Sequence, residues 1–153
     1  MRFINDNEGF TLYIHGVKLD DIDNLKKYIK EKVLFLKKKY FKDISGFYNV
    51  DVYSNDRIGL IISFKREEGF DFLRDIVDLN VKVHDKSLVY FEFDDIFLID
   101  SFNDVYFFNN KFYIDISCLN DIVFFKLIEF GKFIYGESLE KLKTKLNLVV
   151  KNS

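Results

Sequence analysis

The chain has 153 residues, of which 48% are hydrophobic and 31% are charged, and its formal net charge is −2. This length is typical of one domain that buries a substantial core. The near-neutral charge gives no general attraction to nucleic acid or to an anionic membrane, and no apolar run is long enough to span a bilayer.

The residue usage is biased toward amino acids with AT-rich codons. Phe occurs 19 times and Tyr 9 times, whereas Pro and Trp are absent. An AT-rich genome accounts for most of this aromatic excess, so the excess alone does not indicate a binding surface. The polar N-terminus has no signal-peptide core and the single Cys118 cannot form an internal disulfide, so the expected location is cytoplasmic.

The N-terminal part predicts a strand followed by a long helix. Residues 10–15 alternate in polarity and predict a strand. The helix is expected over residues 21–41, with Asp20 or Asp21 as its N-cap. Its apolar stripe consists of Ile22, Leu25, Ile29, Val33, Leu36 and Tyr40. The lysines lie off this stripe, and we expect them to form a solvated face rather than a phosphate-binding one.

The middle of the chain predicts further strands. Residues 48–53 and 58–65 are expected to form a hairpin, in which Gly59 marks a bulge or a close backbone approach. The run 70–79 fits either a short helix or a strand. Residues 81–84 and 88–94 then predict two more strands, and 96–99 fit a short strand or a helical turn.

The most informative stretch is residues 102–116, which reads as two aromatic runs joined by Asn109-Asn110. Asn tolerates positive φ, so a two-residue turn is expected, with Tyr106 facing Tyr113. One face then carries Val105, Phe107, Phe112, Ile114 and Ile116, and we expect it to be core. The other face carries Asp104, Tyr106, Phe108, Lys111, Tyr113 and Asp115, and we expect it to be half exposed.

The C-terminal part predicts two helices. The first is expected over residues 120–130, with Asn120 or Asp121 as its cap and Gly131 at its end. The second is expected over residues 139–146 after Ser138, with its leucines inward, and the tail 147–153 is expected to fray.

Together these elements predict an α+β fold in one compact domain, residues 1–153, with sub-halves 1–68 and 69–153 as an alternative. The fold is expected to be a largely antiparallel sheet of hairpins, with one long N-terminal helix and two C-terminal helices packed on it.

The chain shows no catalytic, cofactor-binding or metal-binding signature. His15 and His84 are isolated in the sequence and fit hydrogen-bonded or solvated positions better than zinc ligands. Cys118 directly follows a predicted strand, so we expect a buried, unreactive thiol. Asp104 and Asp115 would oppose each other across the hairpin, which fits a solvated acidic rim, a surface for a basic partner or, less well, a cation or acid–base pair.

One stretch is similar to the closing part of small nucleotidyltransferases. YIDISCLND, residues 113–121, precedes LIEFGKFIYG, residues 127–136, which resembles their strand aspartate followed by a Gly-Lys-x-x-Tyr turn. That family needs an earlier Gly-Ser turn and a pair of strand aspartates to hold magnesium, and this chain has no Gly-Ser dipeptide. The resemblance therefore implies at most a degenerate, inactive relative.

The order of motifs also resembles the MecA-type adaptors, which bring substrates to the AAA+ unfoldase ClpC. Three stretches carry the resemblance: RIGLIISFK at 57–65, DVYFFNNKFYIDI at 104–116 and LIEFGKFIYGESLEKLKTKL at 127–146. The chain lacks the family's long acidic linker and one helical segment. The resemblance implies a non-enzymatic adaptor, whose C-terminal half docks an unfoldase while its N-terminal half holds a client.

These observations predict a non-enzymatic, cofactor-free protein-binding module, such as an adaptor for an unfoldase. The alternative is an inhibitor or immunity-type protein of a mobile element or virus that masks a partner enzyme. The expected partner is another protein, and not a membrane or a nucleic acid. The partner-binding surface is expected to consist of Asp104, Tyr106, Phe108, Tyr113 and Asp115, because partly exposed aromatic residues are common interface anchors.

Overall fold

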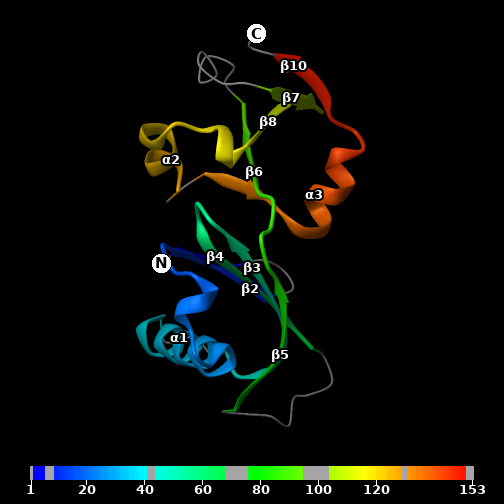
Figure 1. Ribbon diagram of the computed structural model, residues 1–153. Helices are drawn as coiled ribbons and strands as arrows, with labels where there is room; N and C mark the ends of the chain where they lie inside the picture. Colours follow the sequence, from blue (N-terminus) through cyan, green and yellow to red (C-terminus); the bar gives the residue numbers. More distant parts are fainter. Residues whose placement is uncertain are drawn as a thin grey trace. The chain divides into compact units, whose positions relative to one another are not determined.

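A computed structural model describes residues 2–5, 9–40, 44–67, 76–94, 104–128 and 131–150. Within them the protein is a mixed α+β fold, with two five-stranded sheets of mostly antiparallel strands and three helices (Figure 1). The chain divides into two compact units, Met1–Lys86 and Ser87–Ser153. No helix in the described part of the chain is long and apolar enough to cross a membrane.

Two sheets replace the single sheet that the sequence predicted, and the division of the chain falls after residue 86 rather than after residue 68. The reason is the strand β5 (Val77–His84), which returns to the first sheet and pairs there with β3 in parallel. Such a return cannot be read from local patterning, because it depends on a partner strand far away in the sequence.

The first unit contains the sheet β1-β2-β4-β3-β5. Its other strands are β1 (Arg2–Asn5), β2 (Gly9–His15), β3 (Gly46–Asn55) and β4 (Gly59–Arg66). The strand predicted at 10–15 and the hairpin predicted at 48–65 are confirmed. The N-terminus, for which no strand is predicted from the sequence, forms β1 and pairs with β2. Residues 76–79 of the 70–79 run are described, and those from Val77 onward belong to β5.

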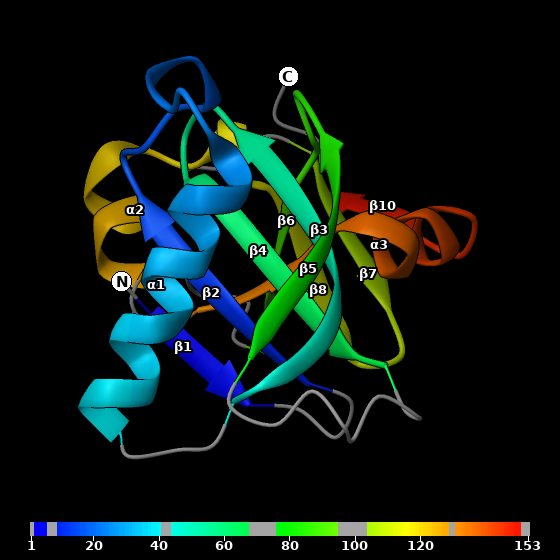
Figure 2. The same ribbon diagram turned by 90° about the horizontal axis from the view of Figure 1, so that it is seen from below.

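The helix α1 (Leu25–Tyr40) follows the one-turn helix η1 (Leu19–Asp21) and lies along one face of this sheet (Figure 2). It begins later than the predicted residue 21, because the cap is Asn24, whose Oδ1 accepts a hydrogen bond from Lys27 N at 3.1 Å. Ile29, Val33 and Leu36 are buried as predicted, whereas Tyr40 at the end of the predicted stripe is 48% exposed. The helix and sheet enclose a core formed by Phe10, Leu12, Ile14, Ile29, Val33, Leu36, Ile44, Tyr48, Val50, Val52, Leu60, Ile62, Phe64 and Leu79.

Gly59, at the start of β4, is a site of close backbone approach. Its φ is +108°, and a Cβ atom placed there would lie 2.4 Å from the carbonyl oxygen of Ile14. Only glycine combines such a φ with this contact. The expectation of a close approach at Gly59 is therefore confirmed.

The second unit contains the sheet β10-β7-β8-β6-β9. Its strands are β6 (Tyr90–Phe93), β7 (Val105–Phe108), β8 (Lys111–Asp115), β9 (Lys132–Ile134) and β10 (Asn147–Val150), and all its pairings are antiparallel. β10 corrects the expectation of a frayed tail: Asn147 and Leu148 pair with Phe107 and Tyr106, so the edge of β7 is covered.

The helices of this unit are α2 (Asp121–Leu127) and α3 (Gly136–Lys143). α2 begins after Asn120, as predicted, and Asn120 Oδ1 accepts from Val123 N at 2.9 Å. α3 begins at Gly136, three residues before the predicted start, and its cap position is Tyr135 instead of Ser138. Leu139 is buried, and Leu142 and Leu146 pack beside it, so the predicted inward leucines are confirmed.

Candidate functional site

The β7–β8 hairpin has the predicted turn and register. Asn109 and Asn110 adopt φ values of 50° and 64°, and Tyr106 pairs with Tyr113 and Phe107 with Phe112. The two asparagines supply the left-handed backbone that a two-residue hairpin turn needs. The registry that defines the two faces of the predicted site is therefore confirmed.

The face that the sequence marked as half exposed is largely covered. Tyr113 is only 6% exposed and lies in a cluster with Tyr90 and Leu139 of α3, while Tyr106 and Phe108 are half buried against this cluster. The phenol rings have enough apolar area to pack under an amphipathic helix, so α3 occupies the face that an isolated hairpin would present to water. Tyr113 is thus a core residue and not a surface anchor.

The two predicted rim carboxylates do not pair across the hairpin. Asp115 is opposite Tyr90 in β6, and its Oδ1 accepts from Ser117 N at 2.9 Å, capping the turn η3 (Ile116–Cys118). Asp104 lies before β7, is exposed and has a φ of 48°. Among the described residues no group of three or more His, Cys, Asp and Glu side chains could hold a metal ion. Residues 95–103, which include the element predicted at 96–99, lie outside the described residues.

Other carboxylates of this sheet are neutralised by lysines. Lys111 Nζ lies 2.5 Å from Asp94 Oδ1, and Lys132 Nζ lies 3.0 Å from Glu92 Oε2. Glu92 also accepts a long hydrogen bond, 3.4 Å, from the hydroxyl of Tyr113. The acidic surface available to a basic partner is therefore smaller than the sequence suggested.

The tyrosines beneath α3 are held in their neutral form. Burial, followed by the nearby Tyr106 and Asp115, raises the pKa of Tyr90 to about 12. Burial, followed by Glu92, raises the pKa of Tyr113 to about 12. A phenol with this pKa is protonated at neutral pH, so neither tyrosine is poised to act as a general base.

Cys118 is exposed at the end of η3, which corrects the expectation of a buried thiol. The strand β8 ends at Asp115, and the turn that follows carries Cys118 away from the core. Ile116 occupies the buried position instead.

The first unit brings together polar residues that the sequence did not connect. His84 Nε2 lies 2.8 Å from Asp51 Oδ1, and the His84 ring stacks on Tyr53 with centroids 4.6 Å apart. Asn80 Nδ2 donates to Asn49 Oδ1 at 3.2 Å. These contacts join β5 to β3 and fit a structural role. His15 Nδ1 likewise lies 3.1 Å from the Ile58 carbonyl oxygen, so the prediction of hydrogen-bonded histidines is confirmed.

Two strongly exposed apolar residues in the described part of the second unit were not predicted from the sequence. Ile122 and Phe125 of α2 are 71% and 60% exposed, and we call them the α2 patch. They are three residues apart and therefore neighbours on the helix surface, whereas Phe124 is buried. The segment DIVFFKL, residues 121–127, indicates that some apolar residues are exposed, because five of its seven residues are apolar and a helix can bury only one stripe.

Comparison of this chain with protein-family models, curated proteins and solved structures found no match.

Proposed function

We propose that this protein is a non-enzymatic protein-binding module that recognises its partner through the α2 patch. The observation that carries the proposal is the exposure of Ile122 and Phe125, at 71% and 60%, on a helix whose opposite side is anchored by the buried Phe124. Aromatic side chains are enriched at the cores of protein interfaces, where they fill apolar pockets of the partner.

The patch is preorganised for binding. The Asn120 cap and the burial of Phe124 hold α2 in its helical form. A preformed helix loses little backbone entropy on association, so more of the burial energy remains for affinity. Asp121 and Lys126 flank the pair and are exposed, giving the patch a polar rim with one charge of each sign. A partner with an apolar pocket inside a polar border fits this surface.

The more specific form of the proposal is an adaptor that presents a client to an AAA+ unfoldase, as the resemblance implies. An adaptor needs two binding surfaces, and the division into two compact units supports this form because each unit can carry one of them. The inhibitor alternative needs only one such surface. Of the five residues predicted from the sequence, Asp104 alone is exposed, so a binding role for that set stays a prediction centred on Asp104.

The test is capture of partners from the native host by the tagged protein, followed by mass spectrometry. Three baits are compared: the natural chain, Ile122→Ser with Phe125→Ser, and Leu34→Ser. Leu34 is a matched control, because it is an exposed apolar residue, at 55%, on the helix of the other unit. All three should unfold at similar temperatures, since surface substitutions usually change stability by less than about 0.5 kcal/mol.

We expect one partner to be lost with the α2 variant and retained with Leu34→Ser. In calorimetry, the purified partner should then bind the natural chain and Leu34→Ser directly, and it should not bind the α2 variant. An unfoldase as partner supports the adaptor, and a nuclease or other enzyme supports the inhibitor. Identical partners for all three baits would refute the assignment of the α2 patch.

A further inference from the structure

The strand β5 is the edge of the first sheet and has one open side. It pairs with β3 from Gly46 opposite Val77 to Tyr53 opposite His84, and no other strand pairs with it in the described part of the chain. Val83 is 46% exposed and Ile76, just before the strand, is 56% exposed. An open edge of eight residues is a template for pairing with another strand.

The backbone groups that face outward belong to the odd-numbered residues of β5. Gly46 N donates to the carbonyl oxygen of Ile76 at 2.7 Å, so Ile76 faces β3. In a parallel pair, alternate residues of a strand bond to the same neighbour, so residues 78, 80, 82 and 84 also face β3. Consistently, Leu79 N bonds to the side chain of Asp78 at 2.9 Å instead of to β3. Val77, Leu79, Val81 and Val83 therefore point their N–H and C=O groups away from the sheet.

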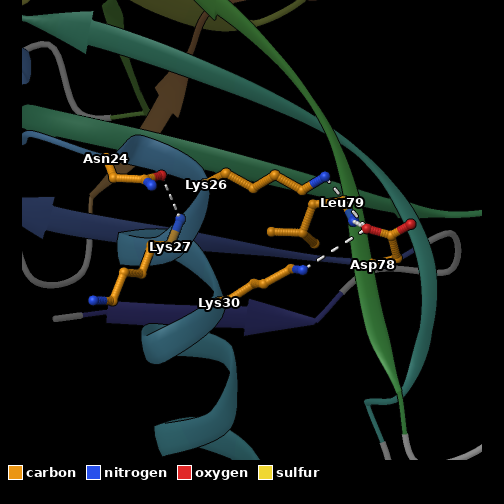
Figure 3. Close-up of polar contacts among 6 residues, drawn as sticks. All are labelled: Asn24, Lys26, Lys27, Lys30, Asp78 and Leu79. Carbon is orange, nitrogen blue, oxygen red and sulfur yellow. Dashed lines mark hydrogen bonds and ion pairs between the residues drawn. The ribbon is translucent and has the colours of Figure 1, made fainter.

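The side chains of β5 carry a charge pattern that is complementary to that of a second, antiparallel β5 strand. Asp78 and Lys82 share one face of the sheet and lie two positions on either side of Asn80. Lys26 and Lys30 of α1 reach Asp78 at 3.4 and 3.8 Å (Figure 3). The Leu79 N–H and Lys26 lower the pKa of Asp78, which keeps its carboxylate charged. Lys82 is exposed, and its Nζ has no described ion-pair partner.

We propose that two copies of this chain associate through their β5 strands, in an antiparallel arrangement centred on Asn80, so that the two sheets become continuous. In this register Asp78 of each copy faces Lys82 of the other, which forms two ion pairs. Leu79 faces Val81 and Val77 faces Val83, and the backbone groups of all four residues point outward, so both are hydrogen-bonded pairs. In the dimer the Leu79 N–H exchanges the Asp78 carboxylate for the Val81 carbonyl oxygen of the second copy. The dimer is isologous, since each copy contributes the same surface.

The charges select this register over its neighbours. A shift of two residues in one direction places Asp78 opposite Asn80, and a shift in the other direction places Lys82 opposite Asn80. Either shift removes both Asp–Lys pairs. The centred register also aligns the apolar row Val77, Leu79, Val81 and Val83 of each copy on the α1 side of the sheet, where Leu79 already belongs to the core.

A monomer in solution is the outcome that contradicts this proposal. A charged side chain on an edge strand, and a carboxylate that occupies an outward N–H, are ways in which natural sheets keep their edges unpaired. In that case Asp78 and Lys82 keep the protein monomeric. The two interpretations differ in a measurable property, the mass of the particle in solution.

The experiment is sedimentation equilibrium of the full chain over a concentration series up to about 500 µM. We expect a reversible monomer–dimer equilibrium. Lys82→Glu places like charges opposite each other twice, so we expect its dimerisation to be at least about tenfold weaker. Lys86→Glu is the control, because Lys86 lies in the turn after β5 and makes the same change of charge outside the paired segment. It should dimerise as the natural chain does.

A mixture of two charge-reversed variants should restore the dimerisation that each variant loses alone. Asp78→Lys alone should not dimerise, because the introduced lysine would face Lys82 of the second copy. Mixed with Lys82→Glu, it should form a heterodimer with two attractive pairs. The folded state of each variant is checked first by thermal unfolding, because Asp78→Lys also loses its contacts with α1.

The register is tested by cross-linking. Asn80→Cys, in a Cys118→Ser background, should oxidise to a disulfide-linked dimer, since opposed residues at a pair without hydrogen bonds have Cα atoms about 4.5 Å apart. Lys82→Cys should not, because the two copies of residue 82 would be about 14 Å apart along the strands. A monomer at every concentration overturns the proposal, and so does a dimer that survives Lys82→Glu and fails to cross-link at residue 80.

Discussion

The imidazole Nε2 of His84 lies 2.8 Å from Oδ1 of Asp51, and this contact joins the last residue of β5 to the middle of β3. The two residues are 33 positions apart in the sequence. Leu79 is the one buried side chain of β5, with Val77 and Val81 packed partly buried beside it, and the contact of His84 with Asp51 adds a polar attachment at the end of the strand.

The first prediction concerns the strength of this contact. We expect a double-mutant cycle with His84→Ala and Asp51→Ala to give a coupling of about 0.2–1 kcal/mol in the free energy of unfolding, because both side chains are about a third exposed. The measurement is urea denaturation of the four proteins. His84→Ala alone should cost more than the coupling, since it also removes the ring stacking on Tyr53. A coupling of zero would show that the contact between His84 and Asp51 does not contribute to the free energy of unfolding.

The second prediction concerns Tyr113, which the sequence placed on an exposed face. Because Tyr113 is 6% exposed and packs with Leu139, Tyr113→Ala should lower the free energy of unfolding by about 3–5 kcal/mol, as for other large aromatic truncations. Ile122→Ala, at a 71% exposed position, is the control and should change it by less than about 0.5 kcal/mol. If the two variants are equally stable, α3 does not cover the hairpin.

The third prediction concerns ionisation at high pH. The raised pKa of Tyr90, about 12 against 10.0 for a free tyrosine, means that the folded state holds the proton more tightly than the unfolded state. Its contribution to stability is therefore complete below pH 10 and is lost as the pH rises from about 10 to about 12. We expect this loss to be smaller in Tyr90→Phe, measured by urea denaturation at a series of pH values.

The ionisation itself can be followed by ultraviolet absorbance of the phenolate. Tyr90→Phe should remove one of the groups that titrate near pH 12. Retention of every group that titrates near pH 12 in Tyr90→Phe would contradict the assignment to Tyr90.

The fourth prediction compares two glycines with positive φ. Gly59→Ala should destabilise the protein by more than about 2 kcal/mol, because the new Cβ would meet the Ile14 carbonyl oxygen at 2.4 Å in addition to the cost of a φ of +108°. Gly16→Ala should cost only about 1 kcal/mol, because φ is +78° but no atom lies within 4 Å of the new Cβ. Thermal and urea unfolding measure both. Equal costs would show that the backbone contact at Gly59 can relax.

Local chemistry was sufficient to predict several elements. The turn at Asn109-Asn110 and the pairing of Tyr106 with Tyr113 follow from the left-handed preference of asparagine and from the two-residue alternation of a strand. The Asn120 cap follows from a side chain that can accept a backbone N–H. Each of these depends on atoms within a few residues of one another, so the sequence alone contains the necessary information.

Long-range packing decided the rest. The hairpin has aromatic residues on both faces, so its pattern could not show that α3 would cover Tyr113 or that β10 would pair with β7. The parallel return of β5 to β3 divides the chain into two sheets, and it depends on contacts such as that between His84 and Asp51. The exposure of Ile122 and Phe125 results from the side of α2 that packs through Phe124. The sequence by itself determined most of the helices, strands and turns, but not the edge strands β1 and β10. The tertiary structure decided these strands and which apolar faces are buried, because both depend on partners that are distant in the chain.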